Sequence, residues 1–586
     1  MEYSIKPKRL GRKENNPLPS KEDNWIIRVT MKKYLDTFKE FLSSRLYCSI
    51  LLLLGVCTYG FVITHYAIGI DDTAISLYFD EGLAPYVGRW TLYIINKVIP
   101  LTKMSPFFME LISMIIMLFS ATTWCILLRK ICNGCVELPI WMYAIFAGIF
   151  ISCPLISEVY VYYLHNGLCL AYGLTALSLL VFLEALHSDT KTWKMIGTVV
   201  LSVILLTIAI GCYESLLLVY IMTAIMIFVF QRITKAQNGC EQKSIGIIRW
   251  IIIGAIILSV SLIIRSGIIN LLNYVNDFET AFAELDSAQR ISIFGSMTRD
   301  EIVMNIKYYF IKYFINAISY FPIRMLLCSY AVLGCIAVVF SVLKRDFWIL
   351  ICTILLPILP AVMCFVGGDA ITYRAAQYVP VVITFAVFFA AVLIWRIRWK
   401  AYLFRSIYAV LLSILIWTQS VEMNQWFMVD YMRYEYEKEI LLQVAKDLQA
   451  TCDVTKPIVF CGSVETPVAI TETSELAFSD SRFPYSRLMF DKFLPGMTGK
   501  QYCPQGYGYH FRETIFNNTI SWGIAAFDGK GTQVIQYLKM LGYNFYGEKD
   551  LEKISEARAY VLEVGMPEYP VTGYIQEFEN YIIVNF

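Results

Sequence analysis

Long apolar runs dominate the first two thirds of the chain. Each run holds about 18 to 22 residues, enough for a helix that crosses the roughly 30 Å hydrocarbon core of a bilayer. The pattern therefore predicts an all-α polytopic membrane module at 47–421, preceded by a cytoplasmic segment at 1–46. The eleven predicted spans are 47–66, 106–127, 138–156, 164–185, 195–212, 214–231, 250–270, 323–343, 347–366, 378–395 and 402–421.

Basic residues orient these spans. Segment 1–46 carries KPKR, GRK and MKK, which predicts a cytoplasmic N-terminus, and the even-numbered spans each return to a basic loop. An odd number of spans then places the C-terminus outside, in a multi-pass protein of the plasma membrane. The basic residues of the returning loops are Arg129 and Lys130, Lys191 and Lys194, Arg232, Lys235 and Lys243, Lys344 and Arg345, and Arg396, Arg398 and Lys400.

Three outer segments are too long to be simple connectors: the loops 67–105 and 271–322, and the tail 422–586. The first loop ends in the amphipathic stretch WTLYIINKVIPL, and the second passes from charged residues to an aromatic stretch typical of a membrane interface. The tail has about 165 residues, which is enough for a hydrophobic core of its own. We predict that it is an extracytoplasmic α/β domain.

The tail shows both helical and strand-like patterns. It opens with YEYEKEILLQVAKDLQ, whose apolar residues fall on one helix face, and a second helical run, TQVIQYLKMLG, follows. Strands are predicted at PIVFCG, ARAYVLEV and YIIVNF. The apolar face of the first helix consists of Ile440, Leu441, Val444 and Leu448.

Composition agrees with a membrane protein and excludes several classes of function. The chain is 57% hydrophobic and 16% charged, with a mean hydropathy of +0.57, whereas soluble chains carry about 25% charged residues. A net charge of +2 excludes nucleic acid as an electrostatic partner. The four His and sixteen Cys form no zinc or redox pattern, since the CxxC of Cys132 and Cys135 stands alone, so we predict no metal ligands.

Candidate chemistry begins directly after the first span, at Asp71 and Asp72 in HYAIGIDDTAISLYF. A partly desolvated Asp at the membrane surface can accept the proton of an attacking hydroxyl group. Two adjacent carboxylates on a helix point in different directions, so one of them at most faces a given substrate. The structural alternative is a helix N-cap, which Asp favours.

Two arginines lie in outer loops that otherwise avoid positive charge. Arg89 follows Gly88 in VGRW, and Arg374 lies in GGDAITYRAAQY. Either guanidinium can bind a phosphate in bidentate fashion, and the neighbouring glycine permits close approach of the backbone. The alternatives are contact with lipid headgroups or an ion pair with a loop carboxylate.

Acidic residues at the outer ends of spans form the next group. Glu158 lies in CPLISEVYVYYLHN and Glu214 in AIGCYESLLL, where it follows Tyr213. Ionisable groups at this depth are costly and usually have a function, and the neighbouring tyrosines suit a sugar ring. The structural alternative is that each acid pairs with a basic residue such as Arg265.

The order of these features resembles the bacterial Gtr-type (type II) glucosyltransferase family, which belongs to the GT-C class of membrane glycosyltransferases. The resemblance covers about residues 47–420 and rests on the DD pair, GRW, PLISEVYVYY, the Tyr-Glu pair and the Arg of the last outer loop. The family often carries Tyr-Gln where this chain has Tyr213 and Glu214.

The resemblance implies transfer of a sugar, glucose or another hexose, from a polyprenyl-phosphate donor to a surface glycan outside the membrane, with inversion expected. It carries the catalytic base over to Asp71 or Asp72, and the GRW motif of the substrate site to Gly88, Arg89 and Trp90. Because a cation stabilises the charge that develops on the leaving phosphate, we assign Arg89 and Arg374 to the donor phosphate. Three further substrate-binding residues complete the predicted site, Glu158, Tyr213 and Glu214. Some GT-C enzymes use a divalent cation and others do not, so a cation cofactor stays open.

Two other functions share these features. A glycan polymerase or ligase also handles a lipid-linked phosphate, but it uses an oligosaccharide donor. A transporter or flippase for lipid-linked sugars needs an aromatic cavity and outward arginines, but it should also show broken helices or paired halves with repeat symmetry, and the sequence shows neither. The large outer loops and the 165-residue tail favour the transferase.

Overall fold

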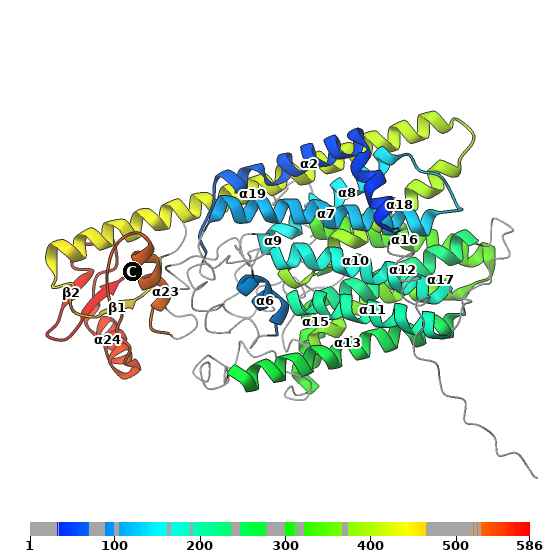
Figure 1. Ribbon diagram of the computed structural model, residues 1–586. Coiled ribbons are helices and arrows are strands. Elements are labelled where there is room, and N and C mark those ends of the chain that lie inside the picture. The colour runs from blue at the N-terminus through cyan, green and yellow to red at the C-terminus, as the bar shows by residue number, and fades with distance from the viewer. Residues whose placement is uncertain are drawn as a thin grey trace, which may run out of the picture.

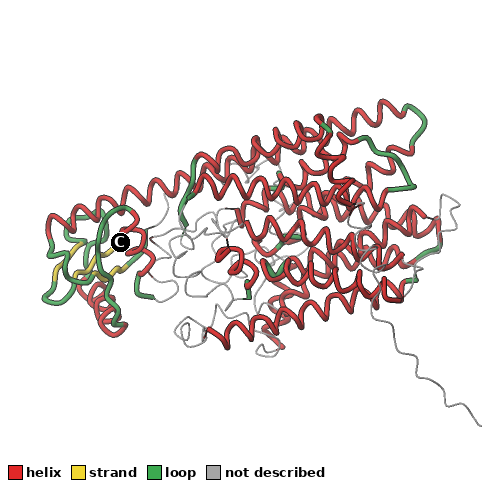
Figure 2. Tube along the Cα trace, viewed as in Figure 1, coloured by secondary structure: helices red, strands yellow, loops and turns green. Residues whose placement is uncertain are grey.

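The structure is a computed structural model of the 586-residue chain. It is a helical bundle with a small sheet at one end (Figures 1 and 2). The structure describes residues 32, 34–69, 88–98, 105–160, 166–187, 192–235, 246–276, 299–310, 313–314, 321–365, 373–464, 520, 524 and 529–586.

Within these residues, nine helices are long and apolar enough to cross a membrane. Each keeps its backbone hydrogen bonds within the helix, as hydrocarbon requires. Shorter helices are α6 (Trp90–Val98) and α15 (Arg299–Phe310). The nine long helices are α2 (Arg45–Thr64), α7 (Pro106–Cys132), α10 (Asn166–His187), α11 (Thr192–Cys212), α12 (Leu216–Lys235), α13 (Ile247–Asn276), α16 (Phe321–Lys344), α18 (Val379–Arg396) and α19 (Ala401–Thr451).

The predicted span 138–156 is bent rather than straight. Helix α8 (Ile140–Ile151) is followed by the 3-10 turn η1 (Pro154–Ile156) and the short helix α9 (Ser157–Tyr160), at an angle of 45°. Proline has no N–H to donate, which interrupts the helical hydrogen bonding at this point. If this bent pair counts as one span, the described residues contain ten spans, and the expectation that the chain has no broken helix is wrong at this point.

The predicted span 347–366 is shorter than a full span. Helix α17 (Phe347–Ile358) starts at the side chain of Asp346, which accepts a hydrogen bond from a backbone N–H of the first turn. The helix contains Pro357, and the chain continues as the 3-10 helix η5 (Leu359–Phe365). The count of eleven straight spans is therefore not reproduced, because proline ends regular α-helix in two of the apolar runs.

Helix α19 continues far beyond the predicted span at 402–421. Its 51 residues correspond to a length of about 76 Å, more than twice the hydrocarbon thickness. It runs beside α2 in the same direction: the Thr58 hydroxyl lies 3.1 Å from that of Ser420, and Ile68 lies beside Arg433 (Figure 1). One rigid rod therefore joins the bundle to the sheet.

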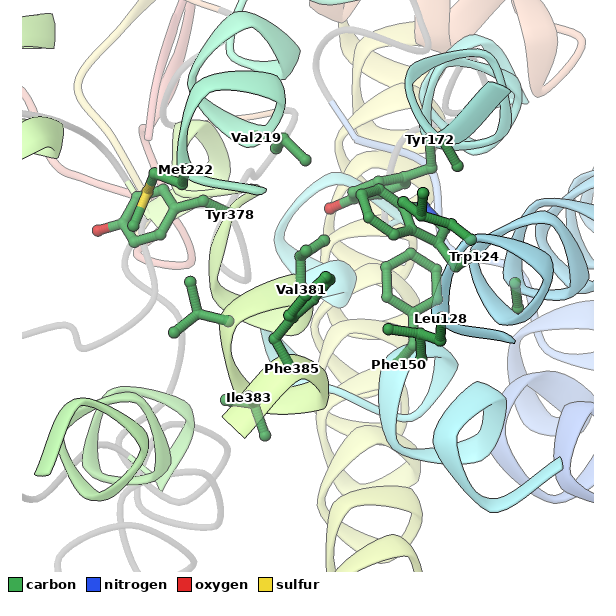
Figure 3. Packing of buried hydrophobic residues seen from close by; sticks show 14 of the residues in the cluster. Trp124, Leu128, Phe150, Tyr172, Val219, Met222, Tyr378, Val381, Ile383 and Phe385 are labelled. Carbon is green, nitrogen blue, oxygen red and sulfur yellow. The ribbon is translucent and has the colours of Figure 1, made fainter. Parts of the chain in front are cut away.

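Aromatic and aliphatic side chains pack together in the centre of the bundle (Figure 3). The ring of Phe150 contacts that of Tyr172 edge-on at 5.0 Å and lies 6.1 Å from that of Trp124. The Tyr172 hydroxyl donates to Gln377, at 2.9 Å from its backbone carbonyl oxygen. This bond holds α10 against the segment that leads into α18.

The sheet follows α19. Strand β1 (Ile458–Cys461) pairs in parallel with β3 (Ile582–Asn585), and β3 pairs antiparallel with β2 (Ile575–Glu577). Helices α19 and α23 (Thr532–Met540) pack on one face of the sheet. Strands β1 and β3 were predicted from PIVFCG and YIIVNF, and helix α23 was predicted from TQVIQYLKMLG. The predicted apolar face of α19 is confirmed, because Ile440, Leu441, Val444 and Leu448 are all buried.

The strand predicted at ARAYVLEV is wrong. These residues form the second half of α24 (Leu551–Val564), which packs on the other face of the sheet. The Asp550 side chain accepts from the N–H of Glu552 at the start of this helix, and Gly565 ends it in the left-handed region. Both caps lie outside the apolar run on which the strand prediction rested.

A buried ion-pair network lies on α19 where it leaves the bundle. Arg433 has 1% of its side chain exposed, and its guanidinium donates to Asp430 at 3.1 Å and to Glu437 at 2.8 Å. A third donor of the same guanidinium lies 3.2 Å from the carbonyl oxygen of Ile68, just after α2. This one cation therefore ties the end of α2 to the α19 rod.

Substitution of Arg433 by Met should destabilise the protein strongly. The change leaves two carboxylates buried without their cation, which costs about 3–5 kcal/mol in comparable networks. The free energy of unfolding, measured by denaturant titration in mixed micelles, reports this loss. The triple variant with Asp430→Asn and Glu437→Gln should recover part of it, because the uncompensated charges are removed.

Lys438→Met is the matched control for this experiment. Lys438 pairs with Glu435 on the same helix, but about one third of each side chain is exposed. Exposed pairs of this kind contribute about 0–1 kcal/mol. Equal losses of stability for the Arg433 and Lys438 variants would contradict the role given to the buried network.

Candidate functional site

The first element of the site is the turn that opens α6. Gly88 has a φ of +91°, which places it in the region that favours glycine. Trp90 is buried against Gly211 of α11, where a Cβ would lie 2.5 Å from the indole Nε1. The Thr91 hydroxyl donates to the carbonyl of Ile208 at 3.0 Å. Helix α6 is therefore fixed against α11 from its first turn.

The second element is the tight turn between α11 and α12. Tyr213 and Glu214 lie in it, and the carbonyl of Tyr213 accepts from the N–H of Leu216 at 3.2 Å. The Arg89 guanidinium lies 4.8 Å from the centre of the Tyr213 ring. Its Nε lies 3.9 Å from a carboxylate oxygen of Glu214, and both side chains are about one third exposed (34% and 32%).

Arg265 of α13 completes this group. Its Nη2 donates to the carbonyl of Gly88 at 3.2 Å, and the guanidinium interacts electrostatically with both Glu214 and Arg89. A Cβ built on Gly88 would lie only 2.3 Å from Nη2, so a side chain at this position would push the guanidinium away from the carbonyl. Two guanidinium groups and one carboxylate give this cluster a net charge of +1.

Glu158 and Arg374 form a second group. Glu158 is fully buried in α9, while Arg374 is exposed in η6 (Tyr373–Ala375), and these two elements contact each other. The neighbouring Tyr160 hydroxyl donates to the backbone carbonyl of Glu110 at 3.2 Å. The structure thus brings Arg374 to the element that carries Glu158, and Arg89 to the turn that carries Tyr213 and Glu214.

Tyr172 supports the second group from within the bundle. Its hydroxyl donates to Gln377, whose side-chain amide in turn donates to the carbonyl of Arg374. Figure 1 places α6 and α9 at the end of the bundle that faces the sheet, which we call the sheet-side end. Both groups therefore border one region at that end.

The predicted bases, Asp71 and Asp72, lie outside the described residues. The nearest described segment before them ends at Gly69, next to the Ile68 carbonyl that Arg433 holds. Among the described residues, no group of three or more His, Cys, Asp or Glu side chains is placed to hold a metal ion.

Three residues that contribute to the site were missed from the sequence. Arg265 was considered only as a structural partner for acids, although a charge within an apolar helix of 30 residues is itself a signal of function. Tyr172 and Gln377 gave no signal, because their contact joins positions 205 residues apart. Glu184 of α10 lies outside both groups and has a structural role, since it pairs with Lys130 at 2.5 Å.

Comparison with known proteins gives one match. A family model described as Glucosyl transferase GtrII matches residues 60–391, more than half of the chain. The matched range includes both groups of the candidate site. No curated protein and no solved structure matches the chain.

Substitution of Gly88 by Ala should disrupt the cluster around Arg265. The new Cβ would displace the guanidinium from the Gly88 carbonyl, in addition to the strain of about 1–2 kcal/mol for a non-glycine residue in the left-handed region. We expect a lower thermal unfolding midpoint for the purified protein in detergent. The additional change Arg265→Ala should recover part of the loss, because it removes the collision.

Gly134→Ala separates strain from collision. Gly134 has a similar φ of +80°, but a Cβ there meets nothing within 4 Å. This control should therefore lower the midpoint less than the Gly88 substitution. The packing around Gly88 would be incorrectly described if both substitutions had the same effect and the double variant recovered nothing.

Proposed function

The chain belongs to the GtrII family of glucosyl transferases, and we propose that it transfers glucose or another hexose from a polyprenyl-phosphate donor to a surface glycan. The observation that carries the proposal is the cationic cluster of Arg89 and Arg265 beside Tyr213 and Glu214. Such a cluster suits a ligand that combines a phosphate with a sugar ring. Residues 60–391, which match the family model, contain it.

A lipid-linked donor follows from the proposed side of the membrane. There is no nucleotide-sugar pool outside the cell, so the activated sugar must arrive on a membrane carrier. The basic loops predict that the site lies outside, and the basic residues Arg129, Arg232 and Lys344 at the other end of the bundle support this orientation. We propose the plasma membrane as the location and the GT-C class as the architecture.

The proposed reaction is a single displacement. The oxygen of an acceptor hydroxyl forms a bond to the anomeric carbon of the sugar, and the bond from that carbon to the phosphate oxygen breaks. The electron pair leaves on the phosphate, and the hydroxyl proton passes to the carboxylate of Asp71 or Asp72. One displacement inverts the anomeric carbon.

The side chains have distinct proposed roles. The guanidinium of Arg89 stabilises the negative charge that develops on the leaving phosphate, with Arg374 as a second donor ligand from η6. Tyr213 and Glu214 hold the sugar through ring contact and hydrogen bonds. Gly88 and Trp90 set the position of Arg89. Glu158 is buried in α9, so we assign it to the sugar only through a movement of α9.

The pair Asp71 and Asp72 should be essential for transfer. Replacing both by Asn removes the proposed base, and loss of a general base lowers rates by about 100- to 10,000-fold. The assay uses the full-length protein in nanodiscs with radiolabelled polyprenyl-phosphate glucose and crude envelope glycan. The control is Glu563→Gln, a change of an exposed carboxylate on α24, which should leave transfer unchanged.

The same assay tests the other two functions. Full transfer by the folded double-Asn variant would exclude the proposed base. A wild-type protein that moves only oligosaccharides would be a polymerase or ligase. Flux of the carrier across sealed liposomes without any transfer would indicate a transporter.

The proposed orientation predicts the location of the C-terminus. Helices α2 and α19 run in the same direction, so a cytoplasmic N-terminus requires that the sheet lie outside. Alkaline phosphatase, which is active only outside the cytoplasm, should be active when fused after Phe586. Fusion after Lys400, in the basic loop before α19, should be inactive, and the reverse pattern would contradict this topology.

A further inference from the structure

Arg265 occupies a boundary position on α13. It lies 18 residues after Ile247, the start of the helix, which corresponds to about 27 Å along an axis that must cross roughly 30 Å of hydrocarbon. Its neighbours face outward, with Ile263 69% exposed and Ile264 39% exposed. The charged group thus lies near the headgroup level of the sheet-side end, on a helix that lipid can reach.

The contacts of Arg265 do not balance its charge. One guanidinium nitrogen donates to the neutral carbonyl of Gly88, and the Glu214 carboxylate is shared with Arg89. The 3.9 Å ion pair of Arg89 is too long for a hydrogen bond. In the described part of the chain, the Nε atoms of both arginines are buried and have no hydrogen-bond partner.

Two such donors beside a net positive charge suit one kind of ligand. A tetrahedral phosphate presents several oxygens, and each of them can accept from a guanidinium group in a charge-assisted hydrogen bond. A buried donor without a hydrogen-bond partner is unfavourable, and a phosphate oxygen would supply the missing acceptor. A neutral sugar would leave the excess charge uncompensated.

We propose that Arg265 and Arg89 together form the binding site for the phosphate of the lipid-linked donor, with Arg265 as the cation on the bilayer side. We call this phosphate-binding site the seat. This assignment rests on the proposed function and deepens it, because it places the phosphate between α6 and α13. The carbonyl of Gly88 orients Arg265, and the absence of a side chain at this glycine gives the guanidinium its room.

The experiment measures binding of polyprenyl phosphate, the product carrier, to the full-length protein in nanodiscs of neutral lipid. Loss of one charge-assisted contact corresponds to an affinity about 10- to 100-fold weaker for Arg265→Ala. Arg265→Lys keeps the charge but loses the planar fork, so it should fall between the alanine variant and the wild type. Arg89→Ala should weaken binding comparably, and the two alanine effects should not be additive, because both residues contact the same phosphate.

Arg249→Ala is the matched control. Arg249 lies on the same helix and donates to the carbonyl of Ala185 at 3.1 Å, near the opposite end of α13. This variant should bind polyprenyl phosphate as the wild type does. The uncharged alcohol, polyprenol, serves as the second probe, and its weaker binding should not depend on Arg265.

Three outcomes would overturn the assignment. Wild-type affinity of the Arg265→Ala variant for polyprenyl phosphate would remove Arg265 from the seat. An equal loss for polyprenyl phosphate and polyprenol would mean that Arg265 only braces the Gly88 turn. Competition by phosphatidylglycerol as strong as that by unlabelled carrier would mean that the seat takes ordinary lipid headgroups.

The proposed function and this assignment fail in different ways. Arg265-dependent binding of polyprenyl phosphate without any sugar transfer by the wild type would support the seat and contradict the transferase. Wild-type transfer together with unchanged binding by the Arg265 variant would support the transferase and contradict the seat.

Discussion

Hydrocarbon offers no hydrogen-bond partner to a backbone amide or to an ionised side chain, and this constraint organises the molecule. The backbone meets it with long helices that satisfy their own N–H and C=O groups. Among the described residues, charged side chains lie largely at the two ends of the bundle, outside the hydrocarbon. Arg232 pairs with Asp346 and Lys130 with Glu184 at one end, whereas Arg89, Glu214 and Arg265 gather at the other. Each of these two cations at the first end has a carboxylate partner, whereas the cluster at the sheet-side end has two guanidinium groups for one carboxylate and so carries an excess positive charge.

That excess charge depends on backbone geometry as much as on the arginines. Gly88 turns the chain with a positive φ and leaves space for the Arg265 guanidinium, while Gly211 lets Trp90 lie directly against α11. Two glycines thus allow three helices to meet closely around charged side chains. In a membrane such close packing also limits the access of water, which strengthens the electrostatic interaction with a bound anion.

Helix α19 connects this site to the sheet. Its buried Arg433 binds two carboxylates of its own helix and the carbonyl of Ile68, at the point where the chain leaves α2. The cation therefore balances the carboxylates of its own helix and also binds the segment that follows α2. The sheet packs against the same helix, with α19 and α24 covering its opposite faces. One continuous helix therefore sets the position of the sheet relative to the end of α2.

The sequence by itself determined the class of the protein, because the length of each apolar run and the cost of exposing amides to lipid leave little choice but spanning helices. It also determined local features with a clear period, such as the buried face of α19 at Ile440 and Val444. It could not identify the breaks at Pro154 and Pro357 as limits of spans, nor the capped helix α24, since hydropathy does not register a missing N–H or a cap. Only the tertiary structure paired Arg89 with Glu214, and Arg374 with the element of Glu158, because contacts between distant segments depend on how helices pack, and no local pattern records that packing.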